Sequence, residues 1–270
     1  MKKILLYVMV MLSFSAFSQN KLDEIKKELQ RQKGLTLVPD KQNVSNSATY
    51  DNSYSDDNIF AALFFEIGVS ITYGILFETF WEKDLPMHDA HFTQYPYFDN
   101  HSGNYTYENR KDYVPFKLVL SGNMFAENNK LHGNYFEAKM KFLDRVDFAG
   151  GFSLISEAES AMSIYDAMFH YHRIRTPKLD IWYGLGVMHL GNKIEQSAFS
   201  LDFGGEWFVK KPISVSAQWQ YGYFDNFYVR KNMFLAKYHI KNFSISFGAV
   251  NYKFYDTSIN TLNLGLNVYL

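Results

Sequence analysis

The sequence predicts an all-β protein, an antiparallel up-and-down transmembrane barrel of ten to twelve strands. Its last eleven residues, "NTLNLGLNVYL", alternate strictly between apolar side chains and amide, hydroxyl or glycine positions. Aromatic residues make up 18% of the chain and there are only 6 Pro, a composition that favours strands over a helical bundle. The same two-residue period recurs in long segments from Pro115 onward, as in strands with one apolar face and one polar face.

The first twenty residues, "MKKILLYVMVMLSFSAFSQN", predict a secretory signal peptide. A basic start at Lys2 and Lys3 precedes an apolar run, and a small-x-small pattern ending at Ser18 suits signal peptidase. We therefore expect residues 1–18 to be removed, the alternative being an uncleaved membrane anchor. The chain has no Cys, which excludes a lipoprotein attachment site, disulfides and cysteine-based metal sites.

Residues 19–58 predict a short amphipathic segment followed by a flexible linker. Leu22, Ile25 and Leu29 recur at helical spacing, and Gly34 would end such a helix. Because a helix this short is marginal in water, we expect a solvated, partly frayed leader on the periplasmic side rather than a docked helix. The sequence after it, "PDKQNVSNSATYDNSYSDDN", is rich in Asn, Ser and Asp and has no apolar period, as in a linker.

The barrel is expected to occupy residues 59–270. Its first segment, residues 59–77, is nearly uncharged and long enough for a membrane-spanning helix. The polar positions from Glu66 to Gly74 fall on every second residue, which favours a strand. With a return strand near "NYTYENR", this segment would raise the strand count from ten to twelve. A long loop is expected between them, at about residues 79–112.

Ten further segments of strand-like alternation follow: 116–126, 133–143, 146–156, 160–172, 179–190, 197–208, 213–223, 226–239, 243–254 and 260–270. A soluble barrel would show charge outside, but the polar positions here are mostly Ser, Gly, Asn and Gln. The segments also have the roughly 9–11 residues that a tilted membrane strand needs, against about 5–6 in soluble proteins. Both features predict an apolar face in lipid around a polar interior.

The connections fall into two alternating sets. Counted back from the C-terminus, one set reads "HIKN", "VKKP", "RIRTP" and "LDRVD" and is basic, while the other is acidic or amide-rich. With both termini on the periplasmic side, the basic set would be periplasmic. Aromatic residues near the strand ends are expected to form interfacial girdles: Tyr135, Trp207, Tyr223, Tyr238, Tyr252 and Tyr269.

These features resemble the outer-membrane β-barrel family of bacteria with two membranes, over roughly residues 60–270 together with the signal. The C-terminal strand, with Tyr269 in "LNVYL", is similar to the element by which such barrels engage their assembly machinery. It departs from that pattern because Leu270 follows the aromatic residue. The resemblance implies an outer-membrane location, contact with outer-membrane lipid and the assembly machinery as a partner. It carries no catalytic residues.

Alternation places Asp166, His170 and His172 on the polar face of "SIYDAMFHYHR". These side chains are the catalytic candidates, as base and orienter of a lipid hydrolase. They equally suit a hydrogen-bond network that fills a narrow barrel, which we favour. The nucleophile segment of the known outer-membrane phospholipase has no counterpart here, since no Ser stands two residues from a His along a strand.

Within the long loop, "PMHDAHF" offers His88, Asp89 and His91 as metal-ligand candidates, but neither a rigid helix nor a matching third ligand is evident. An extracellular polar loop is the simpler interpretation. The Tyr-, Asn- and Asp-rich stretch after it suits contact with a glycan or a protein, or folds back over the barrel mouth. The glycines in "DFAGGF" and "YGLGV" are expected where a strand bends or a large neighbour needs room.

The sequence thus predicts a non-enzymatic outer-membrane barrel with a structural, adhesive or accessory role, its exposed loops forming the contact surface. A net charge of −1 and the lack of a cationic track argue against a nucleic-acid partner, and no cofactor is expected. The alternatives are an outer-membrane lipid-modifying hydrolase that uses the interior Asp and His residues, a narrow channel, and a soluble periplasmic β-protein.

Overall fold

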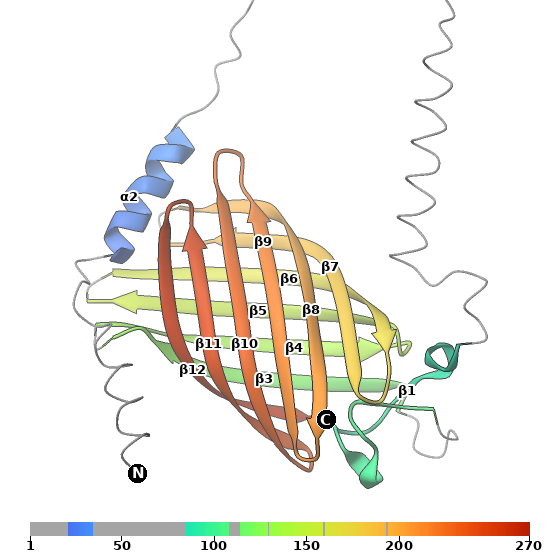
Figure 1. Ribbon diagram of the computed structural model, residues 1–270. Helices are drawn as coiled ribbons and strands as arrows, with labels where there is room; N and C mark the ends of the chain where they lie inside the picture. The colour runs from blue at the N-terminus through green and yellow to red at the C-terminus, as the bar shows by residue number, and fades with distance from the viewer. Residues whose placement is uncertain (1–20, 35–84, 108–113, 129, 159, 193) are drawn as a thin grey trace, which may run out of the picture.

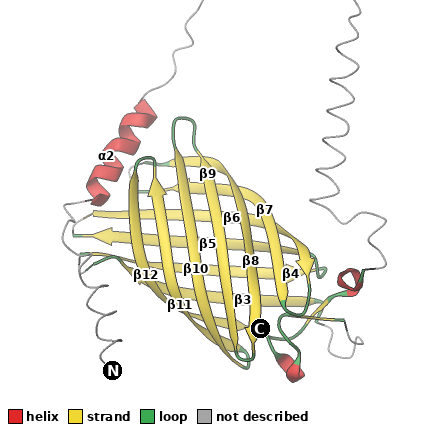
Figure 2. Ribbon diagram, viewed as in Figure 1, coloured by secondary structure: helices red, strands yellow, loops and turns green. Residues whose placement is uncertain are grey.

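The computed structural model describes residues 21–34, 85–107 and 114–270, except for residues 129, 159 and 193. Ten antiparallel strands close into one barrel, in which each strand pairs with its sequence neighbours and β12 returns to β3 (Figures 1 and 2). They are β3 (Phe116–Ala126), β4 (Leu131–Phe142), β5 (Val146–Glu157), β6 (Ser160–Arg175), β7 (Leu179–Leu190), β8 (Gln196–Lys210), β9 (Ile213–Tyr223), β10 (Tyr228–Ile240), β11 (Phe243–Phe254) and β12 (Thr257–Tyr269). The predicted fold class is confirmed, with ten strands in the barrel.

The remaining described elements are short and lie outside the barrel wall: α2 (Lys21–Gly34), η2 (Pro86–Asp89), β1 (His91–Phe92), η3 (Phe98–Asn100) and β2 (Tyr105–Thr106). The predicted return strand near "NYTYENR" is wrong as a barrel strand, because β2 is two residues long and pairs only with β1. The predicted signal peptide and the 59–77 segment lie outside the described residues. No described helix has the length and hydropathy to cross a membrane.

The outer face of the barrel is apolar in the half of the wall that lies nearest the C-terminus. On β12, the outward side chains of Leu262, Leu264 and Leu266 are 53%, 58% and 49% exposed, whereas inward Asn263 is 1% exposed. Outward apolar residues continue through Val268 to Leu270, directly after the strand, so the apolar stretch is nine residues long. That length matches a tilted crossing of a bilayer core. An exposed belt of this kind is stable in lipid rather than in water, and the fold is a transmembrane β-barrel.

Toward the opposite end, the two faces of the wall exchange character. Outward positions become polar there, as at Asn232, Asn251 and Asn260. Inward positions become apolar and form one buried cluster that includes Phe125, Ile155, Met188, Val250, Tyr252 and Phe254. This end therefore has the polarity of a soluble barrel, with an apolar core inside and polar groups outside, and it extends beyond the lipid belt.

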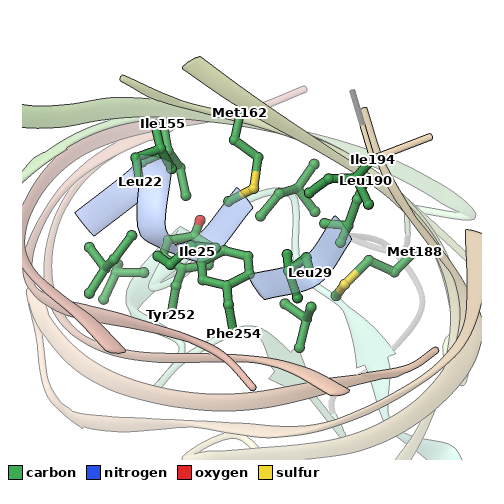
Figure 3. Close-up of a cluster of buried hydrophobic side chains, with 14 of the residues drawn as sticks. Leu22, Ile25, Leu29, Ile155, Met162, Met188, Leu190, Ile194, Tyr252 and Phe254 are labelled. Carbon is green, nitrogen blue, oxygen red and sulfur yellow. The ribbon is translucent and has the colours of Figure 1, made fainter. Parts of the chain in front are cut away.

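Helix α2 docks into this apolar end, which corrects the expectation of a solvated leader. Leu22, Ile25 and Leu29 are at most 1% exposed and point into the apolar cluster (Figure 3). The helix start is fixed by Glu157, whose Oε2 accepts a hydrogen bond from the Leu22 backbone N–H at 2.6 Å. Near the helix end, Lys33 Nζ donates to the Ile194 carbonyl at 2.5 Å. The predicted helix is confirmed over Lys21–Gly34; tertiary packing supplies the stability that the isolated helix lacks.

Residues 85–107 cover the other end, where the C-terminus lies (Figure 1). Buried Lys117 donates to the Thr93 carbonyl at 3.1 Å and to Asn104 Oδ1 at 2.6 Å. Tyr97 Oη donates to the Ile213 carbonyl at 2.5 Å, beside the "VKKP" turn. The described part of the predicted loop at 79–112 therefore lies with the basic turns, so this part cannot be extracellular if those turns are periplasmic. The expectation of an extracellular loop depended on a twelve-strand barrel; with ten strands, the segment before β3 joins the barrel at the same end as the C-terminus.

The predicted aromatic girdle is half correct. Outward-facing Trp207, Tyr223 and Tyr238 are more than half exposed, as interfacial rings would be. The other three, Tyr135, Tyr252 and Tyr269, fall on the opposite parity and are buried inside the barrel.

We expect Leu266→Lys to destabilise the barrel in lipid by roughly 2–4 kcal/mol, because it places an ammonium near the middle of the lipid-facing belt. Asn260→Lys is the matched control, since it changes an outward position of the same strand beyond the belt and should cost about 0–1 kcal/mol. Denaturant unfolding from lipid vesicles measures both. Equal costs would show that β12 does not face lipid.

We expect Leu29→Ala to weaken the docking of α2 by roughly 2–5 kcal/mol through loss of buried apolar contact. Trypsin should then cleave the basic residues of α2 faster than in the unmodified protein, while the barrel keeps its heat-dependent gel mobility. Gln30→Ala, at an exposed position of the same helix, provides the control. Unchanged protection of α2 in Leu29→Ala would contradict the docked position.

Candidate functional site

A chain of alternating carboxylates and imidazoles crosses the barrel interior near its C-terminal end. His170 Nδ1 lies 2.6 Å from Asp147 Oδ1, and His170 Nε2 lies 2.7 Å from Asp202 Oδ2. His172 Nε2 lies 2.7 Å from Asp147 Oδ2, and His172 Nδ1 lies 2.5 Å from Asp180 Oδ1. The five side chains come from the adjacent strands β5, β6, β7 and β8, and each residue is at most 3% exposed. We call this set the His–Asp chain.

The contacts between ring nitrogens and carboxylate oxygens indicate the charge of the His–Asp chain. An ionised carboxylate only accepts, so every ring nitrogen that contacts one must carry a proton. Both nitrogens of His170 and of His172 contact carboxylates, so with Asp147, Asp180 and Asp202 ionised the two rings would be imidazolium cations between three carboxylates. Lys141 Nζ lies 3.4 Å from Asp180 Oδ2 and supplies a third positive charge. Buried charges are tolerated when they are paired in this way.

Strand register and one glycine permit this arrangement. Asp147 and His170 are direct partners across β5 and β6, and His170 is opposite Gly184 on β7. Gly184 in turn is opposite Asp202 on β8, so His170 reaches Asp202 across a residue without a side chain. A Cβ at Gly184 would lie 2.3 Å from the His170 ring. The prediction that the "YGLGV" glycines make room for a large neighbour is confirmed here.

The structure brings together two of the three catalytic candidates and separates the third. His170 and His172 share Asp147, whereas Asp166 lies 4.0 Å from Lys231 and is not part of the His–Asp chain. The pattern of single strands did not reveal Asp147, Asp180 and Asp202, because their proximity depends on register between strands. Each lies at an inward position of an alternating segment, which is the signal that could have marked it as part of the interior.

A second buried polar group lies between β8, β9 and β10. Ser214 Oγ donates to Glu206 Oε1 at 2.6 Å and lies 2.7 Å from His239 Nε2, while Lys237 Nζ lies 3.0 Å from Glu206 Oε2. A Ser–His contact is thus present across two strands, where a search along single strands could not find it. It lacks nucleophile geometry, because the Ser214 proton is directed to Glu206 and the residue is 0% exposed.

Little open space remains between these groups. A cavity of about 80 Å³ lies in the interior, lined by residues that include Glu137, Lys139, Trp182 and Lys237. Since a water molecule occupies about 30 Å³ of liquid volume, this cavity holds a few waters. Beside the buried ion pairs, this part of the interior thus holds a small wet cavity.

Two of the three metal-ligand candidates contact side chains of the barrel and not one another. His88 Nδ1 lies 3.0 Å from Arg145 Nη2, and His91 Nδ1 lies 3.1 Å from Asp144 Oδ2. Asp89 ends the short helix η2. Within the described residues, no group of three or more His, Asp or Glu side chains is arranged to hold a metal ion. Pairing with Arg145 and Asp144 instead ties the 85–107 segment to the turn between β4 and β5.

Comparisons with known proteins find no matching family model and no matching curated protein. Among solved structures, the chain is similar to the KdgM porin (12% identity, 56% of this chain and 98% of that chain, TM-score 0.35) and to the NanC porin (9%, 57% and 100%, TM-score 0.39). It is also similar to the Yersinia pestis outer-membrane protein Ail in a phospholipid nanodisc (10%, 58% and 100%, TM-score 0.35). At these identities and TM-scores, the likenesses carry no argument about function.

We expect Asp147→Asn to destabilise the barrel by roughly 3–5 kcal/mol, because it leaves two buried imidazolium groups without their shared carboxylate. Asp225→Asn, in an exposed turn, is the matched control and should change stability little. Denaturant unfolding in lipid vesicles compares the two. A cost near zero for Asp147→Asn would mean that the His–Asp chain is not the ionic network described here.

Proposed function

We propose that this chain is a closed, non-enzymatic outer-membrane barrel with a structural or accessory role, and that its 85–107 segment forms the contact surface. The observation that carries the proposal is the occupancy of the interior and of both ends. The His–Asp chain crosses the interior near the C-terminal end, residues 85–107 cover that end, and α2 fills the opposite end. Such a barrel acts through the surfaces that it presents rather than through its lumen.

The two alternatives fit this geometry less well. A narrow channel needs a continuous aqueous path, whereas the interior cavity has a volume of about 80 Å³. A hydrolase needs a histidine with one ring nitrogen free to accept a proton from a nucleophile. In His170 and His172 both ring nitrogens contact aspartates, and the Ser214 hydroxyl is directed toward Glu206.

The outer-membrane location is part of the proposal. It is supported by the lipid-facing belt of a closed β-barrel, by the predicted signal peptide and by the strand-final Tyr269. The assembly machinery, acting on β12, is the expected partner during insertion. Outer-membrane lipid is the expected partner of the belt afterwards.

Planar-bilayer recording tests the closed state. We expect the purified, reconstituted protein to produce no discrete conductance steps, because paired charges and side chains occupy its lumen. An open porin reconstituted in the same lipid serves as the positive control. Reproducible unitary steps from this protein would overturn the proposal in favour of a channel.

A further inference from the structure

A pocket of about 230 Å³ opens at the C-terminal end of the barrel, between the 85–107 segment and the turns after β8 and β10. This size lies just below the roughly 300–1,000 Å³ of typical small-molecule sites, so it suits a ligand of about one sugar ring. Its lining includes Tyr95, Tyr97, Asn100, Lys211, His239 and Lys241.

The aromatic wall of this pocket is held in place from several sides. Tyr97 packs edge-on against Phe208 and His239, with ring centroids 5.8 and 5.4 Å apart, and Tyr95 packs edge-on against Phe98 at 5.1 Å. Burial raises the pKa of Tyr97 to about 12, so its hydroxyl remains a donor to the Ile213 carbonyl. Fixed tyrosine rings with polar edges suit the faces of hydroxylated rings.

The backbone of this wall is strained. Tyr97, Asp99 and Asn100 have φ angles of 65°, 44° and 65°, in the left-handed region. Asn and Asp tolerate that region, but a bulky residue such as Tyr rarely adopts it. Strain of this kind persists when surrounding contacts enforce it, and it concentrates at ligand sites. Here the enforced turn directs Tyr97 toward the barrel mouth, where its hydroxyl reaches Ile213.

His239 lines the pocket and has one buried ring nitrogen without a partner among the described residues. The residue is 5% exposed, and its Nε2 must donate to Ser214 Oγ, because the Ser214 proton already goes to Glu206. A neutral ring that donates from Nε2 has a bare lone pair on Nδ1. Among the described residues, Nδ1 has no hydrogen-bond partner. Since an unmet buried acceptor is costly, this position favours a ligand that brings an O–H donor.

The charge of the pocket favours an anion. Lys211 and Lys241 line it together with one carboxylate, Asp99, so the lining side chains carry a net positive charge. Lys211 Nζ lies 3.1 Å from Asn100 Oδ1, which holds its ammonium at the rim. A lysine ammonium can recognise a carboxylate through a charge-assisted hydrogen bond.

We infer that this pocket binds a small carboxylated sugar, with Tyr95 and Tyr97 against the ring, His239 accepting from a hydroxyl, and Lys241 and Lys211 contacting the carboxylate. The inference rests on the proposed contact role of the 85–107 segment and names its ligand class. Such a carboxylate occurs both in uronic acids of exported polysaccharides and in the muramic acid of the cell wall.

Ligand-observed NMR on the full mature protein in detergent micelles tests the inference with four probes. D-glucuronate and N-acetylmuramic acid carry both a carboxylate and ring hydroxyls, and their relative affinities distinguish the two sources. D-glucose lacks the carboxylate, and cyclohexanecarboxylate lacks the hydroxyls. We expect each single-feature probe to bind roughly tenfold more weakly than the better acidic sugar, the effect of one charge-assisted hydrogen bond.

Two variants locate the binding. Lys241→Met keeps the aliphatic stem and should abolish the preference for the acidic sugar over D-glucose, whereas Lys130→Met, at the opposite end of the barrel, should preserve it. An equal affinity for D-glucose and the acidic sugars, no binding of any probe, or an unchanged preference in Lys241→Met would each overturn the inference. Conductance recording tests the closed barrel separately, so an electrically silent barrel that binds no sugar would refute only this ligand assignment.

Discussion

The pairing of β12 with β3 is the constraint on which the rest of this structure depends. In lipid, a strand edge would leave unpaired N–H and C=O groups at a cost of several kcal/mol each, and closure removes both edges. A closed ring also fixes the register of every strand relative to the others. That register places Asp147, His170, Gly184 and Asp202 at one level of the barrel, so backbone pairing determines which charges meet.

The wall of the barrel is adapted to two surroundings along its length. Toward the C-terminus, leucines and aromatic rings face outward and charged side chains are paired inside. Toward the opposite end the arrangement reverses, and the apolar interior becomes a docking site for α2. The two-residue alternation continues through both halves of each strand. What changes along the strand is whether the inward or the outward positions carry the apolar residues.

Both ends combine apolar burial with polar contacts, in different proportions. Helix α2 buries Leu22, Ile25 and Leu29 in the apolar cluster and is also held by hydrogen bonds such as that from the Leu22 N–H to Glu157. The 85–107 segment is held by hydrogen bonds and ion pairs, such as those of Lys117 with Asn104 and of His91 with Asp144. Polar contacts leave donors and acceptors available at the surface of that end. This is why the ligand pocket is proposed there rather than in the lumen.

The sequence by itself determined the barrel class and the ten alternating segments that form its wall, because both follow from a local period of two, but it left the strand count between ten and twelve. It also predicted the helix at Lys21–Gly34 and the interior position of His170 and His172. Only the tertiary structure decided that α2 docks, that the 85–107 segment lies with the basic turns, and that Asp147 and Asp202 rather than Asp166 contact His170. These features depend on contacts between residues far apart in the chain, which a local pattern does not encode.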